Sequence, residues 1–409
     1  MSERLRTYLP FWVAFTLPLG FLGVLGVAGL ILFFLLTPLL TRSSWTLAAA
    51  GLPLALITVA SAALSPSPAE SLPPAVGLAV LYTLGLATIH SLTLNTPGES
   101  LIQAFILGTV LLAFSVMADS IFGWRNIPSG LFWQEGLHNW TATSLVLAFP
   151  LSLHLALRYQ VSPRSRGAGI AVIILLLLGV ALSLSWVGAI GLVVGTLTYL
   201  LLRWPKSSGL FLVSTAFLIW ALAGMLQAGF ATFQLGGYSL ANLGDVFFGR
   251  LRIFAEGLEM ASLRPVIGWG YSVGRISPIL EEHGIGAYYV DDLALPHFHS
   301  LYVQTLFENG VLGFAALLFL IAFLFLRQRG TVSVAIRAAI VGFAAVQMFD
   351  FSWAQSSLIL SVWLVASIGQ PAKSDGQLSD HRLASSRALS ATQHSPSVLT
   401  ETMMEARQE

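Results

Sequence analysis

Long apolar segments separated by short polar ones fill most of the chain between Phe11 and Gln370. The apolar runs are continuous and lack period-two alternation, so they predict helices rather than strands. A helix of about 20 apolar residues crosses the hydrocarbon core of a bilayer, where every backbone polar group needs a partner within the protein. We therefore predict an all-α, polytopic membrane protein with about 12 transmembrane helices. The predicted spans are residues 10–23, 24–41, 45–64, 75–94, 100–119, 141–159, 167–185, 187–203, 208–229, 299–326, 331–350 and 354–370.

The spacing of these spans divides the chain into four parts. Residues 1–229 carry the first nine helices, 230–298 form one long, partly helical loop, and 299–370 carry the last three helices. Residues 371–409 are polar, with too few apolar side chains for a core, and are predicted to be a disordered tail. The start, MSERLR before a long apolar run, resembles a signal peptide but lacks a small-residue cleavage site, so we expect a retained first helix.

Composition supports the membrane class and excludes several activities. The chain is 56% hydrophobic and only 10% charged, whereas a soluble domain is about 25% charged. It has no cysteine, which excludes disulfides, thiol nucleophiles and cysteine metal sites. No nucleotide-binding loop, EF-hand or His-Glu-x-x-His zinc motif is present, which argues against an energy-coupled pump.

The distribution of positive charge predicts the orientation. With both termini in the cytoplasm, only five of the 20 Lys and Arg residues fall outside. This agrees with the positive-inside rule and supports an even number of spans, with the long loop facing outward. Four of the five outward arginines lie in that loop, and this concentration of positive charge on the outer side needs a separate explanation. The five are Arg125, Arg250, Arg252, Arg264 and Arg275.

The first candidate element of the outward loop runs from Arg250. Apolar positions at helical spacing predict a helix from Arg250 to Leu263, ended by Pro265, with Arg250, Phe254, Leu258 and Ala261 on one face. The turn after it holds Gly268 and Gly270, which permit a close backbone approach. A guanidinium suits a multi-oxygen anion such as a phosphate. The alternative is that Arg250 merely binds lipid headgroups or caps a helix.

The second element begins at His299, which we expect on a helix where the loop enters the tenth span. A neutral imidazole there accepts a proton from a hydroxyl near neutral pH. His297 and His299 with Asp291 or Asp292 are an alternative metal site, but the spacing is common by chance. Glu308 lies further along the same span and needs a partner, either a basic group or a neighbouring helix end.

Together these residues resemble the O-antigen ligase and polymerase superfamily of bacterial inner-membrane proteins. The first motif is an arginine, an aromatic four residues on, a helix, and Pro-x-x-Gly-x-Gly, here Arg250, Phe254 and PVIGWG. The second is His299, here followed by Ser300, with Tyr302, Glu308, Gly310 and Gly313. A third match is Asn139, before a helix that ends in proline. The outward loop around Asn139 is also rich in tryptophan, which is typical of an interfacial belt and also suits sugar stacking.

One position departs from the family pattern. Many members carry Ser-Arg-Gly near the outer end of a middle helix, and that arginine shares the pyrophosphate with the loop arginine. Here SLSWVGAIG places Trp186 at that position. Either a nearby arginine supplies the second positive charge, or the substrate differs from the usual one. The candidates are Arg252, Arg264 and Arg275.

The resemblance implies a GT-C-like glycosyltransferase in the bacterial inner membrane that requires neither metal nor another cofactor. Its donor would be a glycan on polyprenyl (undecaprenyl) diphosphate, and its acceptor a hydroxyl, such as lipid A core, at the periplasmic face. Arg250 and His299 would be catalytic, and Arg252, Arg264, Arg275, Trp186, Asn139, Tyr302, Glu308, Gly268 and Gly270 would bind substrate.

Three alternatives stay open. Two of them lie within the superfamily: a repeat-unit polymerase, and an enzyme that transfers a glycan to a protein hydroxyl. The third belongs to another class of protein: a transporter of small anions such as bicarbonate, a role suggested for some relatives. Transport usually places ionisable groups near the bilayer midplane, and the spans here hold few of them.

Overall fold

The computed structural model describes the membrane helices and parts of the connecting segments. The described residues are 3–19, 23–36, 42–94, 96–122, 138–158, 163–183, 185–207, 209, 234–235, 238–271, 297–351 and 356–368.

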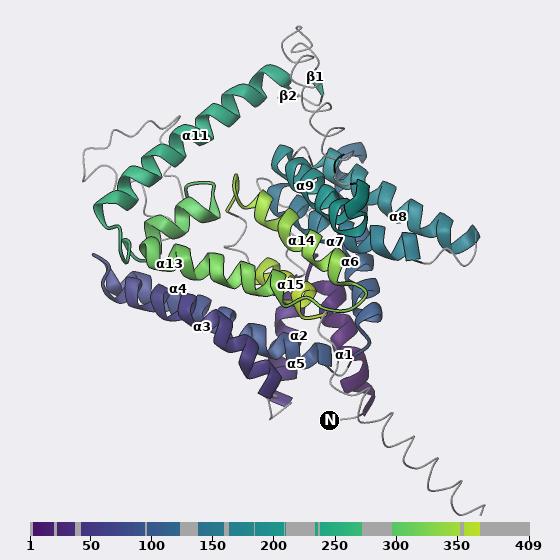
Figure 1. Ribbon diagram of the computed structural model, residues 1–409, viewed down its shortest axis with the longest axis horizontal. Helices are drawn as coiled ribbons and strands as arrows, with labels where there is room; N and C mark the ends of the chain where they lie inside the picture. Colours follow the sequence, from purple (N-terminus) through teal and green to yellow (C-terminus); the bar gives the residue numbers. More distant parts are fainter. Residues whose placement is uncertain are drawn as a thin grey trace, which may run out of the picture. The chain divides into compact units, whose positions relative to one another are not determined.

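The regular secondary structure of the described residues is helical apart from one short antiparallel pair of strands, β1 (Gln234–Leu235) and β2 (Tyr238–Ser239) (Figure 1). The helices are α1 (Glu3–Thr16), α2 (Gly23–Leu36), α3 (Arg42–Ala63), α4 (Pro68–Val80), the π-helix η2 (Leu81–Gly85), α5 (Leu86–Leu94), α6 (Gly98–Phe122), α7 (His138–Arg158), α8 (Pro163–Leu182), α9 (Trp186–Arg203), the 3-10 turn η4 (Pro205–Ser207), α11 (Leu240–Leu263), α13 (Leu301–Leu326), α14 (Ser333–Val346) and α15 (Ser356–Ile368).

The polytopic helical fold predicted from the sequence is confirmed. Among the described residues, six helical segments are long and apolar enough to cross a bilayer, and three shorter apolar helices accompany them. The six are Ser44–Ala63, Pro68–Leu94, Gly98–Ala118, Asn139–Arg158, Trp186–Arg203 and Leu301–Leu326. The predicted span 208–229 and the predicted tail 371–409 lie outside the described residues, apart from residue 209.

Two predicted helices have the wrong limits. The first helix was expected at 10–23, but α1 begins at Glu3 and ends at Thr16. Polar residues such as Glu and Arg are good helix formers, and Pro18 disfavours helical geometry at the residue before it. The loop helix was expected from Arg250, but α11 already begins at Leu240. Its first turns contain glycines that weaken the helical signal in the sequence.

Helix α11 packs against the start of α13 along the side of the helix that carries Gly257. Gly257 is in such close contact that an added Cβ would lie 2.5 Å from Val303 and 2.9 Å from Phe298. Met260 and Ala261 are buried, whereas Leu258 is 49% exposed. Leu258 therefore does not share the packed face with Ala261, because the contact with α13 follows the Gly257 side of the helix.

Small residues bring α9 and α14 close together. Gly191 and Gly195 of α9 face Gly342 of α14, and a Cβ on Gly191 would lie 2.9 Å from the carbonyl oxygen of Gly342. Small residues at helix crossings let backbones approach in membrane proteins. This contact places the first residue of α9, Trp186, beside the segment that follows α14, where Phe349 lies 5.3 Å from it between ring centroids.

The Pro-x-x-Gly-x-Gly turn docks onto a break in α13. At Gly310 the backbone has φ 62° and ψ −167°, which interrupts the helical hydrogen bonding. The turn supplies partners: Pro265 O accepts from Val311 N at 2.8 Å, while Trp269 N and Gly270 N donate to the carbonyls of Phe307 and Glu308 at 2.8 and 2.9 Å. The main chain of the turn thus completes the main chain of the broken helix.

Substituting Gly310 by alanine is expected to destabilise the protein by on the order of 1–3 kcal/mol or more, because the φ/ψ region is one that essentially only glycine adopts. The new Cβ would also lie 2.3 Å from Val266 O. Thermal unfolding of the detergent-solubilised protein measures the effect. Gly330→Ala is the matched control, since Gly330 has φ 87° but a Cβ added there would meet no heavy atom within 4 Å. Equal loss in both variants would mean that the docked turn adds nothing.

Candidate functional site

Residues 349–351, which follow α14 closely, are the centre of the candidate site. Phe349 O accepts a hydrogen bond from an Arg250 guanidinium nitrogen. Asp350 Oδ1 accepts from Asn139 Nδ2 at 3.0 Å. The ring of Phe351 packs against that of His297, with centroids 5.4 Å apart. This short segment therefore joins the loop helix α11, the start of α7 and the histidine motif.

Arg250 is held by aromatic rings as well as by this carbonyl. Its guanidinium carbon lies 5.0 Å from the ring centroid of Trp186, within the range of a cation–π contact. Phe349 stacks on Phe254 at 6.2 Å and packs obliquely on Trp186. Trp186, the residue at the position of the family's second arginine, thus lies against the guanidinium of the first one.

Burial and a neighbouring carboxylate act in opposite directions on Arg250. Burial lowers the pKa of the Arg250 guanidinium, and the charge of Asp350 raises it. Arginine keeps its proton at any physiological pH, so Arg250 is a partly buried cation beside a buried anion. Such a cation is suited to a ligand that brings further negative charge.

His299 precedes α13 instead of lying on it, contrary to the prediction. Ser300 is the N-cap residue, with its hydroxyl accepting from Val303 N at 3.4 Å, and the helix begins at Leu301. His299 has φ 51°, the one positive φ of a non-glycine residue among the described residues. Strained backbone of this kind is concentrated at functional sites, where the surrounding structure holds it.

His297 supports the backbone of His299 through its ring. His299 N donates to His297 Nδ1 at 3.2 Å, and the two rings lie edge to face at 4.4 Å. Since Nδ1 accepts this bond, the hydrogen of a neutral His297 ring lies on Nε2. Burial lowers the pKa of His297, Asp350 raises it and Arg250 lowers it, so burial favours the neutral ring.

Two of the remaining loop arginines, Arg252 and Arg264, lie in the described residues. Arg252 is exposed on α11. The Arg264 guanidinium lies 4.5 Å from the centroid of the Trp269 ring. Arg275 lies outside the described residues, as do Asp291 and Asp292 of the alternative metal site. Among the residues that the structure describes, no group of three His, Cys, Asp or Glu side chains is placed to bind a metal ion.

The backbone at Gly268 and Gly270 lies close to other residues of the protein. A Cβ on Gly268 would lie 2.5 Å from the main chain of Glu308, and one on Gly270 would lie 2.4 Å from Ser65 Cβ. Ser61 of α3 completes the junction, with Oγ 2.5 Å from the carbonyls of Ile267 and Glu308. These glycines hold the loop on α3 and α13.

Tyr302 and Glu308 point into the helical bundle. The Tyr302 hydroxyl donates to Ala344 O at 2.9 Å, which links α13 to α14. Glu308 is buried, and its Oε1 accepts from Gln304 Nε2 at 2.7 Å. Gln304 Oε1 accepts in turn from Phe298 N at 3.0 Å. Glu308 is therefore connected to the residue before His299 through one amide side chain.

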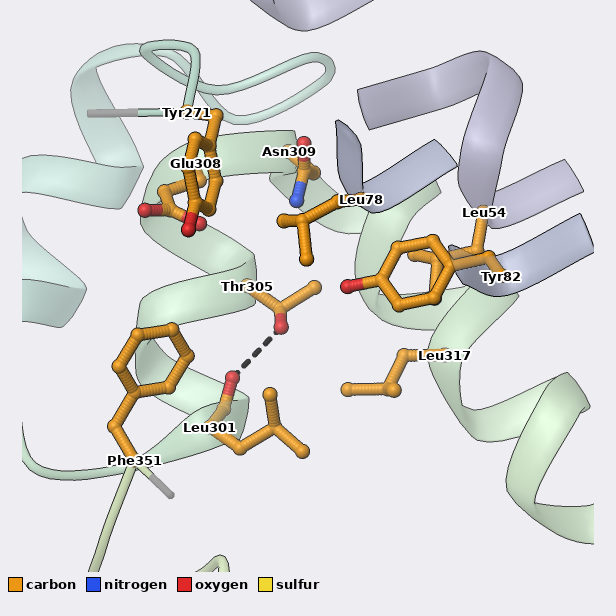
Figure 2. A pocket seen from close by; sticks show the side chains of 10 residues that line it. All are labelled: Leu54, Leu78, Tyr82, Tyr271, Leu301, Thr305, Glu308, Asn309, Leu317 and Phe351. Atoms are coloured by element: carbon orange, nitrogen blue, oxygen red, sulfur yellow. Dashed lines mark hydrogen bonds between the residues drawn. The ribbon is translucent and has the colours of Figure 1, made fainter. Parts of the chain in front are cut away.

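A small cavity lies beside Glu308 (Figure 2). Its water-accessible volume is about 10 Å³, the lower limit for one water molecule. Figure 2 shows the Tyr271 ring beside Glu308 and the Tyr82 hydroxyl directed toward the space around Leu78 and Thr305. Burial and the charge of Glu308 raise the pKa of Tyr271, which therefore stays a neutral hydrogen-bonding group.

Sequence reasoning missed Asp350 and Ser185. Ser185 Oγ donates to Asn139 Oδ1 at 2.6 Å, so Asn139 has protein partners at both ends of its amide. An ionisable residue at the end of an apolar span was the available signal for Asp350. Its place at the predicted water boundary made it look like an ordinary helix-end residue.

Comparison with known proteins gives a family match. Residues 171–318 match the family model of O-antigen ligases. The resemblance to the O-antigen ligase and polymerase superfamily is confirmed. The matched range includes Trp186, Arg250 and His299, and the apolar helices of the described residues agree with a multi-pass membrane protein.

One curated protein similar to this chain is the exopolysaccharide production protein ExoQ of Rhizobium meliloti (strain 1021). The two are 25% identical over 146 residues, which is 36% of this chain. The chain spans about a third of the length of this curated relative, 33%. The name of that relative connects it with polysaccharide production, in agreement with the family match.

Proposed function

We propose that the chain transfers a glycan from a polyprenyl diphosphate carrier to an acceptor hydroxyl at the periplasmic face of the inner membrane, with both termini in the cytoplasm. The observation that carries the proposal is the segment 349–351, which contacts the Arg250 guanidinium and the His297 ring, itself packed on His299. A cation suited to a diphosphate and an imidazole suited to a hydroxyl then belong to one site.

The chemistry follows from these two groups. The acceptor oxygen bonds to the anomeric carbon of the donor sugar as the bond between that carbon and the diphosphate oxygen breaks. His299 takes the proton of the acceptor hydroxyl. Negative charge builds on the leaving diphosphate, and the preorganised Arg250 guanidinium stabilises it. The products are the glycosylated acceptor and the carrier diphosphate.

Of the two activities in the superfamily, we propose a ligase in preference to a polymerase. In a ligase the acceptor is a lipid such as lipid A core, and in a polymerase it is a second lipid-linked repeat. Trp186, which replaces the second arginine of many members, supports a diphosphate site built on one arginine and an aromatic ring. Arg252, Arg264 and Arg275 remain proposals for contacts with the rest of the donor.

A gel of surface glycans and carrier-linked glycans from a deletion strain tests this proposal. Complementation with the wild-type gene is the reference. Long polymer left on the carrier in the deletion strain is the result expected for a ligase, and single repeats are the result expected for a polymerase. Unchanged glycan pools would reject glycan transfer in that host.

A further inference from the structure

Three buried polar side chains form a hydrogen-bonded chain that ends at Asp350, the residue after Phe349, whose carbonyl binds Arg250. Ser185 caps α9, Asn139 lies in the first turn of α7, and Asp350 follows α14. They are 3%, 6% and 4% exposed. Asn139 is the middle link, with one bond to each of the other two. Three helix ends therefore meet through side chains that water does not reach.

The hydrogen bonds in this chain run in one direction. Gly188 N donates to Ser185 Oγ at 3.0 Å, and the Ser185 hydroxyl donates to Asn139 Oδ1 at 2.6 Å. With its oxygen on the Ser185 side, the Asn139 amide directs Nδ2 to Asp350 Oδ1 at 3.0 Å. Asp350 thus accepts a hydrogen bond at Oδ1, which is the role of a carboxylate oxygen.

Asp350 directly follows Phe349, whose carbonyl accepts a hydrogen bond from the Arg250 guanidinium. The charge of Asp350 raises the pKa of two neighbouring groups, Arg250 on α11 and His297 before α13. A buried charge is costly unless it is paired and hydrogen-bonded, and removing one partner leaves the other uncompensated. Arg250 has Trp186 against its face and Phe349 O as an acceptor, and Asp350 adds the opposing charge.

We propose that Asp350, oriented by Asn139 and Ser185, is a positioning residue that fixes the Arg250 guanidinium for the leaving diphosphate. The inference rests on the proposed function and explains how a single arginine suffices where many relatives have two. Asp350 itself stays in contact with Asn139 and away from the anionic ligand, since two anions repel. The chain Ser185–Asn139–Asp350 is therefore part of the scaffold of the site.

The test exchanges the two central residues in one variant, Asn139→Asp with Asp350→Asn. The exchange retains the Ser185 bond, a carboxylate–amide pair and the total charge. It moves the negative charge from position 350 to position 139, the next side chain in the hydrogen-bonded chain. The full-length protein is purified in detergent and assayed with polyprenyl diphosphate-linked glycans extracted from host membranes. We expect kcat to fall about 100-fold, as for misaligned catalytic groups, without a rise in KM for the donor.

The outcomes separate positioning from a structural role. A structural role would lower the yield of monodisperse protein, while the folded fraction would retain its kcat. Wild-type kcat in the exchanged variant overturns the inference, whereas a wild-type protein without transfer activity would reject the proposed function instead. The single variant Asp350→Asn should show the same fall in kcat if it folds.

A milder variant decides the case if the exchanged protein does not fold. Ser185→Ala removes the donor that orients Asn139 and should lower kcat about 3- to 10-fold, the size of one buried hydrogen bond. Ser361→Ala is the matched control, because Ser361 is also fully buried and its hydroxyl donates to Ser357 O at 2.8 Å within α15. Equal kcat in the two serine variants would overturn the inference.

Discussion

Replacing His299 by asparagine is expected to lower the rate of glycan transfer by about 100-fold or more, the contribution of a general base. Asparagine is the informative choice because His299 has φ 51°, a conformation that asparagine tolerates better than alanine does. The loss then reports the missing imidazole and not new backbone strain. Initial rates of transfer with purified protein, normalised to the monodisperse fraction, measure it.

His154→Asn is the control for His299→Asn. His154 lies on α7 and contacts Tyr199 edge to face, with ring centroids 6.3 Å apart. The same exchange there should leave the transfer rate within about twofold, as for changes outside an active site. Wild-type rates in His299→Asn would remove the ring from catalysis, and failure of the protein to accumulate would assign it a structural role.

Replacing Arg250 by lysine is expected to lower kcat about 100-fold, similar to the loss of one donor that stabilises the transition state. Lysine keeps the charge but loses the planar fork that holds a diphosphate at two oxygens. It also loses the flat contact with Trp186. The folded protein should remain in the membrane, so the effect appears in steady-state kinetics with a carrier-linked donor.

Arg327→Lys is the matched control for the arginine. The Arg327 guanidinium also lies over an aromatic ring, 5.6 Å from the centroid of Phe323, at the far end of α13 from His299. Losing that contact costs a cation–π interaction without touching the site. Retained activity in Arg250→Lys would place the diphosphate elsewhere in the protein.

The fold was predictable because hydropathy alone specifies helices in a bilayer. The helix limits were less predictable, as α1 and α11 show, since polar and glycine-containing turns at helix ends carry no apolar signal. The candidate pair Arg250 and His299 came from motif resemblance. The structure connects Arg250 directly, and His299 through the His297 ring, to residues 349–351, but the substrate contacts of the pair stay a prediction.

Contacts between distant segments were the part that the sequence did not predict. The glycines of the turn indicated a close approach, yet only the structure identifies its partner as the main chain of Glu308. Asp350 and Ser185 were missed for the same reason, because a hydrogen bond between α7 and the end of α14 spans 211 positions of sequence. Local patterns report local structure, and these bonds depend on the packing of three helices.

The junction between the turn and α13 has a consequence for sequence variation. Its bonds join main-chain groups of Pro265, Trp269 and Gly270 to those of Val311, Phe307 and Glu308. Main-chain bonds do not depend on which side chains the residues carry, provided that glycine stands where the backbones touch. The side chains of Val266, which is 56% exposed, and Ile267 take no part in these bonds. The loop helix α11 can thus change its side chains while the turn that follows it stays fastened to α13.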